Sequence, residues 1–125
     1  MQKPISVELI NEYGDHAIRV RIDGHSALLD ATEVDGFIEE LGKLRATIRP
    51  AVPDQPLRTH QYAIEIDPCW YTERHPMFDG SVMFLRHTGL GWAGFALPTE
   101  SVRRLKSALS ALEAKAKREA HLLPN

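Results

Sequence analysis

The chain has a single cysteine, Cys69, among its 125 residues. One cysteine cannot form an intramolecular disulfide, and sparse cysteine is typical of proteins that fold in a reducing compartment. A chain of this length can bury a hydrophobic core without disulfides or bound metals. We therefore predict a cytoplasmic protein.

Long apolar runs are also absent. No stretch approaches the roughly 20 residues that a helix needs to cross a bilayer, and no apolar region of a secretory signal follows Met1. The formal net charge is −2, which gives no general attraction to nucleic acid or to an anionic membrane. We expect a soluble protein with no membrane partner.

Motifs for metal binding and catalysis are missing. The six histidines and Cys69 form no Cys-x-x-Cys, His-x-x-x-His or His-Glu-x-x-His pattern. Gly89-x-Gly91-x-x-Gly94 matches the letters of the dinucleotide fingerprint, but we expect a strand after it rather than the helix that would meet a pyrophosphate. We predict no cofactor, no metal and no catalytic residue.

The segment 81–112 is expected to organise the fold. Ser81 to His87 is apolar on both faces, as in a strand that is covered on both sides. Glycines between residues 88 and 91 allow a tight reversal into a second strand, 92–97. Thr99 is the expected N-cap of a helix. Its apolar stripe consists of Val102, Leu105, Leu109, Leu112 and Ala116.

The first half of the chain predicts strands at 5–10, 17–22 and 25–29, followed by a helix. In the second of these strands Ile18, Val20 and Ile22 alternate with charged residues, which indicates one buried and one wet face. Asp23-Gly24 is a hairpin signal. Thr32 and Asp35 resemble a capping box, although Asp30 competes as the N-cap. The apolar stripe of this helix consists of Val34, Phe37, Ile38, Leu41, Leu44 and Ile48.

A proline-rich segment, 50–59, joins two halves of similar pattern, about 1–49 and 60–123. Shifting the chain by 68 residues places Leu29 on Leu97 and Val34 on Val102. We predict one α+β domain in which an antiparallel sheet carries two helices on one face, with a tandem β-β-(β)-α pseudo-repeat as a further hypothesis. The strand at 81–87 needs cover on its second face, and a second copy of the chain would supply it. A homodimer is therefore expected.

The second half opens with a predicted strand at 61–67, after which residues 67–80 look irregular. This segment is longer than a hairpin needs, and prolines stiffen it around several aromatic rings. Such a loop is typical of a recognition surface. The predicted partner-binding residues are Cys69, Trp70, Tyr71, His75, Met77 and Phe78. The alternative is that the rings fold back over an open end of the sheet.

Two other functions stay open from the sequence. A single-stranded nucleic-acid binder would use the exposed sheet face, through Arg19, Arg21, Arg86 and His87, although 17 acidic residues disfavour this partner. A small enzyme or metal protein would act at Cys69, His75 and His87. The preferred interpretation is a homodimeric interaction module that contacts an unidentified protein through the loop 68–78.

Overall fold

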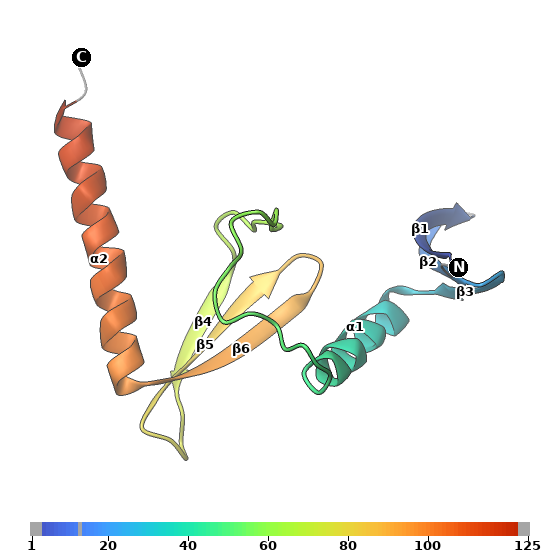
Figure 1. Ribbon diagram of the computed structural model, residues 1–125, viewed down its shortest axis with the longest axis horizontal. Helices are drawn as coiled ribbons and strands as arrows, with labels where there is room; N and C mark the ends of the chain where they lie inside the picture. The colour runs from blue at the N-terminus through green and yellow to red at the C-terminus, as the bar shows by residue number, and fades with distance from the viewer. Residues whose placement is uncertain (1–3, 13, 123–125) are drawn as a thin grey trace. The chain divides into compact units, whose positions relative to one another are not determined.

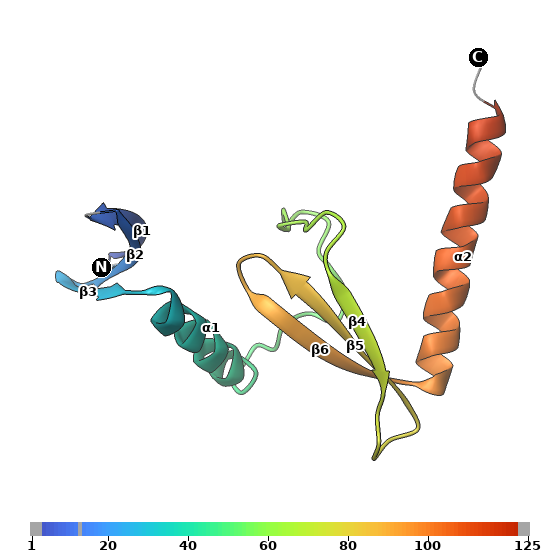
Figure 2. The ribbon, with the colours of Figure 1, turned by 180° about the vertical axis from the view of Figure 1, so that it is seen from behind.

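The computed structural model describes residues 4–12 and 14–122 (Figure 1). They form an α+β structure in which three antiparallel strands precede a helix, twice over (Figure 2). The elements are β1 Ile5–Glu12, β2 Asp15–Ile22, β3 His25–Leu29, α1 Ala31–Arg45, β4 Trp70–Arg74, β5 Gly80–His87, β6 Gly91–Pro98 and α2 Thr99–Leu122. The predicted tandem α+β arrangement is confirmed, with the strands divided between two sheets.

The spacing of the two repeats agrees with the internal pattern of the sequence. Helix α1 begins at Ala31 and α2 begins at Thr99, which is the expected offset of 68 residues. Compact units form around the two repeats, with their boundary between Ala63 and Ile64. Within its own unit, each helix contacts the two preceding strands: α1 contacts β2 and β3, and α2 contacts β5 and β6.

The first sheet has the order β1-β2-β3 and separates apolar from polar side chains. The register places Val7 beside Val20, and Val20 beside Ala27. Since successive side chains of a strand point to opposite faces, Glu8 and Arg19 share the other face, where they form an ion pair of 3.1 Å. Asp23 and Gly24 both have positive φ, of 50° and 84°, as the predicted two-residue hairpin requires.

Helix α1 is capped by Asp30. The Asp30 carboxylate accepts a hydrogen bond from the backbone N–H of Glu33 at 2.8 Å, and the Glu33 carboxylate accepts one from the N–H of Asp30 at 3.0 Å. This reciprocal pair is the capping box. The predicted box of Thr32 and Asp35 is therefore wrong, because Asp30 has the extended backbone of an N-cap while Thr32 already lies inside the helix.

The second sheet has the order β4-β5-β6, with the doubly apolar strand β5 in the centre. Seven of its eight residues, all except Arg86, are half-buried. Gly91, at the start of β6, has a φ of 87° and supplies the positive φ expected for this reversal. Helix α2 leaves the end of β6 directly, as Figure 1 shows. The predicted hairpin that leads into a helix is confirmed.

Two predictions next to this hairpin are wrong. Residues 61–67 form no strand, although their apolar residues alternate. Trp70–Arg74, which the sequence analysis placed in an irregular loop, is the strand β4 and pairs with β5. Asp67 has a φ of 48°, so the chain turns before β4 begins. Trp, Tyr and Thr are strong strand formers, and here that tendency determines the structure.

None of the side chains whose burial the structure describes is fully buried. Large apolar residues of both sheets and both helices keep a third or more of their surface exposed, among them Val7 at 65%, Leu109 at 58% and Trp70 at 67%. Ile22, predicted to point inward, is 46% exposed. The apolar faces that the sequence predicts are therefore formed but uncovered. Within the described residues, no helix is long and apolar enough to cross a membrane.

Candidate interaction surface

Three aromatic side chains and one carboxylate lie together on one face of the second sheet. Tyr71 pairs with Phe84 across β4 and β5, and their ring centroids are 6.1 Å apart. The Tyr71 hydroxyl donates a hydrogen bond of 3.2 Å to the Glu73 carboxylate. Trp92 on β6 completes a shallow depression with these three residues. We call Tyr71, Glu73, Phe84 and Trp92 the ring surface.

Gly94 determines the shape of this surface. It lies opposite Phe84 in the register of β5 and β6. A Cβ atom at this position would come within 2.8 Å of the Phe84 ring, so any side chain would displace the ring. The glycine therefore allows the Phe84 ring to lie over β6. Tyr71 and Trp92 remain more than half exposed, at 54% each.

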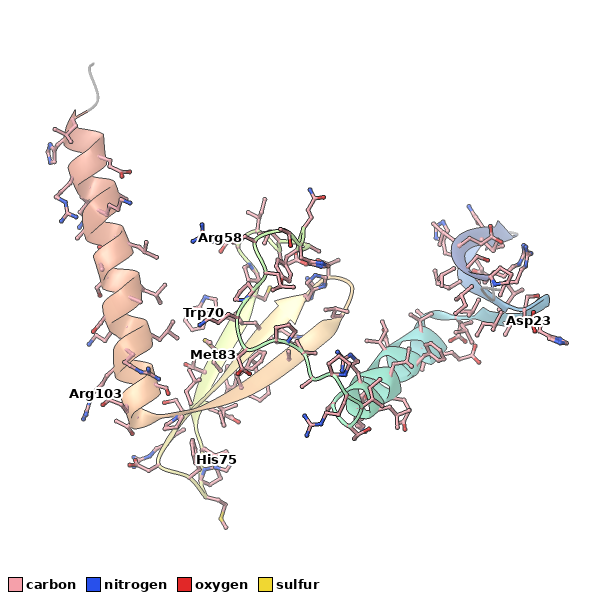
Figure 3. All side chains as sticks on the ribbon, in the orientation of Figure 1. Asp23, Arg58, Trp70, His75, Met83 and Arg103 are labelled. Carbon is pink, nitrogen blue, oxygen red and sulfur yellow. The ribbon has the colours of Figure 1, made fainter. Side chains whose placement is uncertain are left out.

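The opposite face of the second sheet meets the start of α2. Side chains of the sheet and of the first half of the helix line an open groove, which we call the α2 groove: Thr72, Ser81, Met83, Leu97, Val102, Leu105, Lys106, Leu109, Ser110 and Glu113. The register places Trp70 of β4 on this same face, which it shares with Met83 of the neighbouring strand β5 (Figure 3). The helix diverges from the sheet toward its C-terminal end, and the exposed fraction of its apolar side chains therefore rises, from 38% at Leu105 to 63% at Leu112.

The six predicted partner-binding residues are divided among three places. Trp70 and Tyr71 lie on opposite faces of β4, since they are adjacent in a strand. Cys69 is exposed just before this strand, where its carbonyl accepts a hydrogen bond from the N–H of Arg86 at 3.0 Å. The other three, His75, Met77 and Phe78, belong to the turn between β4 and β5.

The turn between β4 and β5 is held by its own side chains. His75 Nδ1 accepts a hydrogen bond of 3.0 Å from the N–H of Met77, and the His75 ring meets the Phe78 ring edge-on at 5.6 Å. Figure 3 shows His75 at the tip of the hairpin. The Met77 side chain is 88% exposed. The segment predicted as one recognition loop therefore consists of a strand, β4, and a short turn that follows it. The aromatic rings of β4 point to opposite faces of the sheet.

Glu65 attaches the chain before β4 to the turn between β5 and β6. Its carboxylate accepts a hydrogen bond of 2.6 Å from the backbone N–H of Thr88. This hydrogen bond, together with the nearby His87 and Arg86, lowers the pKa of Glu65 below its usual value. His87 Nδ1 accepts hydrogen bonds from the N–H groups of Gly89 and Leu90, at 3.0 Å each, so this ring belongs to the same turn.

The residues of the nucleic-acid alternative come from both units. Arg19 and Arg21 lie in the first unit, and Arg86 and His87 lie in the second. Arg19 is paired with Glu8 at 3.1 Å. Single-strand binding needs a continuous basic groove with stacked rings. In the register of the first sheet, no aromatic residue pairs with Arg19 or Arg21.

The metal and enzyme alternative has no assembled site within the described residues. Cys69 precedes β4 and His75 follows it, so a strand of about 3.3 Å per residue separates the two side chains. His87 is at the Cys69 end of the hairpin. Among residues 4–12 and 14–122, no three histidine, cysteine or acidic side chains are placed to hold a metal ion.

Sequence reasoning missed Phe84, Trp92 and the α2 groove as parts of a surface. Two observations could have identified this surface: the alternation of side chains along each strand, and the pairing of β4 with β5. The second was missed because the residues of β4 were expected to form a loop. Comparison with protein-family models, curated proteins and solved structures finds no match.

Proposed function

We propose that the protein is an interaction module that works as a homodimer and binds a protein partner through the ring surface. The observation that supports the proposal is the area left uncovered. The chain exposes 11,707 Å². Two compact globules of half its mass, even without touching, would expose only about 8,100 Å² by the size scaling of folded proteins. Large apolar side chains of both sheets and both helices contribute to this exposed surface, among them Leu9, Leu41, Trp92 and Leu112, and exposed apolar faces are typical of proteins whose cover comes from another chain.

The composition of the ring surface supports a protein partner. Tyrosine and tryptophan are enriched in the energetically important centres of interfaces, and Tyr71 and Trp92 are both more than half exposed. Arg86 lies opposite Trp92 in the register, and Glu73 borders the rings. A partner segment with aliphatic side chains over the rings, flanked by polar groups, would complement this arrangement. Cytoplasmic location is part of the same proposal, supported by the exposed single cysteine, Cys69.

Selection from a random-sequence peptide library tests the ring surface. The wild-type protein alone serves as bait, and the affinities of the enriched peptides are then measured for the wild type and for Trp92→Ala. We expect enriched peptides to carry aliphatic or aromatic residues and to lose at least tenfold in affinity for Trp92→Ala, as is usual when a central interface aromatic is truncated. Met77→Ala is the matched control, because Met77 is more exposed but lies outside the ring surface.

The proposal is overturned if selected peptides bind Trp92→Ala as well as the wild type, or if Met77→Ala weakens them equally. Circular dichroism of each variant establishes that the sheet is intact. The homodimer is measured separately, by the sedimentation experiment described below.

A further inference from the structure

We infer that the homodimer forms by antiparallel pairing of two α2 helices, with each helix lying in the α2 groove of the other copy. This inference rests on the proposed homodimer and adds its contact surface and orientation. The occupant of the groove is a second copy of this chain. Three features support this arrangement: the apolar stripe of α2, the uncovered sheet face beside it and the charges that border the stripe.

Helix α2 is longer than its own sheet can cover. It has 24 residues, about 36 Å at 1.5 Å per residue. Of its apolar stripe, Val102, Leu105 and Leu109 line the groove beside the sheet, whereas Leu112 and Ala116 lie beyond it. Leu109 and Leu112 are 58% and 63% exposed. The stripe has the spacing of a coiled-coil seam from Val102 to Ala116. Two heptads alone make a weak coiled coil, so the helix needs the sheet face as additional cover.

The apolar area available matches what a stable dimer needs. Trp70 and Phe95 share the sheet face, and they are 67% and 50% exposed; an aromatic side chain buries about 150–250 Å² when covered. Together with Leu105, Leu109 and Leu112, the exposed apolar area is on the order of 500 Å². A standard interface buries about 800 Å² on each partner, of which about 60% is apolar. The sheet face beside the α2 groove and the stripe therefore together supply the apolar part of one standard interface.

Charge complementarity selects the antiparallel orientation. In an antiparallel pair Leu109 packs against Leu112 of the second copy, and Leu105 packs against Ala116. Lys106 and Glu113 line the groove on the same flank of the seam. This register brings Lys106 of each copy close to Glu113 of the other, so that the two-fold axis generates the pair twice. A parallel pair instead places Lys106 against Ser101 and Glu113 against Ala108, which are uncharged.

Charge reversal tests the seam by sedimentation equilibrium of the full chain, whose monomer mass is 14.1 kDa. We expect a dimer for the wild type. Lys106→Glu and Glu113→Lys should each raise the dimer dissociation constant by about tenfold, because two attractive pairs become repulsive. The double variant should return to within about threefold of the wild type, and it lacks only the intrahelical pair of Glu113 with Lys117 at 3.3 Å.

Arg103→Glu is the matched control. It makes the same charge change on α2, but Arg103 lies outside the stripe and the groove, with its side chain 74% exposed. Its dimer dissociation constant should stay at the wild-type value. The seam is overturned if Lys106→Glu behaves like Arg103→Glu, or if the double variant is not rescued. A wild-type monomer at all concentrations overturns the homodimer itself. A dimer whose dissociation constant is unchanged by these charge reversals overturns only the antiparallel α2 contact.

Cross-linking reads the orientation directly. In a Cys69→Ser background, Leu109→Cys and Leu112→Cys are prepared separately and then mixed under mild oxidation. The antiparallel seam predicts a disulfide mainly between the two different variants, because their Cβ atoms face each other across the two-fold axis. Disulfides mainly between identical chains would overturn the antiparallel orientation.

Discussion

At the scale of single residues, the side chains that position the candidate surface are small or polar ones with a specific partner. Gly94 leaves room for the Phe84 ring, and Glu65 joins the segment before β4 to the turn at Thr88. Glu65 did not stand out in the sequence, and Gly94 did so only within the rejected dinucleotide pattern, because the importance of each depends on a partner 10 or more positions away in the chain. The pattern of the sequence identifies faces of strands, but it does not identify such pairs.

The pKa of Glu65 gives a prediction at this scale. Because the Thr88 N–H stabilises the ionised carboxylate, the hydrogen bond is complete above the usual pKa of 4.5 and is lost as the pH falls through the lower value in the folded protein. In an NMR titration, the amide proton of Thr88 should shift with a midpoint below 4.5. In Glu65→Gln, the Thr88 amide should show no such transition. A midpoint at or above 4.5 in the wild type would contradict the contact.

At the scale of elements, most helices and strands were predicted from the sequence, but one strand was assigned to the wrong segment, 61–67 instead of Trp70–Arg74. The hairpins at Asp23-Gly24 and around Gly91 followed from residues that tolerate positive φ, and both helices followed from their apolar stripes. Residues 61–67 alternate as a strand does, yet Trp70–Arg74 is the segment that pairs with β5. Alternation shows that a segment suits a sheet, but it does not show which segment obtains a partner, because pairing is a non-local interaction.

The N-cap of α1 provides a prediction at the scale of the element. Asp30→Ala removes the acceptor for the Glu33 N–H and should lower the free energy of unfolding by about 1 kcal/mol, as measured by urea denaturation followed by circular dichroism. Thr32→Ala is the control: it lies in the first turn of the same helix without a capping bond in the structure, so its cost should be much smaller. A larger loss for Thr32→Ala would favour the capping box expected from the sequence.

At the scale of the whole chain, the tandem pattern was visible in the sequence, but of the uncovered apolar faces the sequence indicated only that of the strand at 81–87. The 68-residue offset between equivalent leucines agrees with the observed starts of α1 and α2. The sequence predicted the residues of both helical stripes but not their cover, because periodicity reports which residues share a face and not what covers them. Leu41 at 50% exposure and Leu109 at 58% illustrate the difference. The composition of the candidate surface was therefore only partly predictable, since it depends on strand register.

The long connection between the two repeats supports a prediction for the whole chain. Between α1 and β4 no described residue belongs to a helix or strand, and Arg58 lies in an exposed turn of this segment (Figure 3). Brief digestion with trypsin should cut first after Arg58, because the other basic residue inside this connection, Arg49, precedes a proline. Mass spectrometry should find fragments that end at residue 58 and begin at residue 59.

Arg58→Gln should abolish this first cut and leave the slower ones unchanged. An earlier cut within α2 or within β4 to β6 would show that the connection is better protected than its exposure suggests. It would also contradict the assignment of residues 46–69 as a segment without regular structure.

The two repeats are alike in order but unequal in length, since α1 has 15 residues and α2 has 24. A duplicated chain whose halves were interchangeable could join tail to head without end and grow into fibres. Only the C-terminal helix is long enough to supply the proposed seam, and Pro50 follows soon after α1 ends at Arg45. In the proposed dimer, the longer α2 would therefore limit self-association to two chains, because each α2 pairs only with the α2 of the other copy.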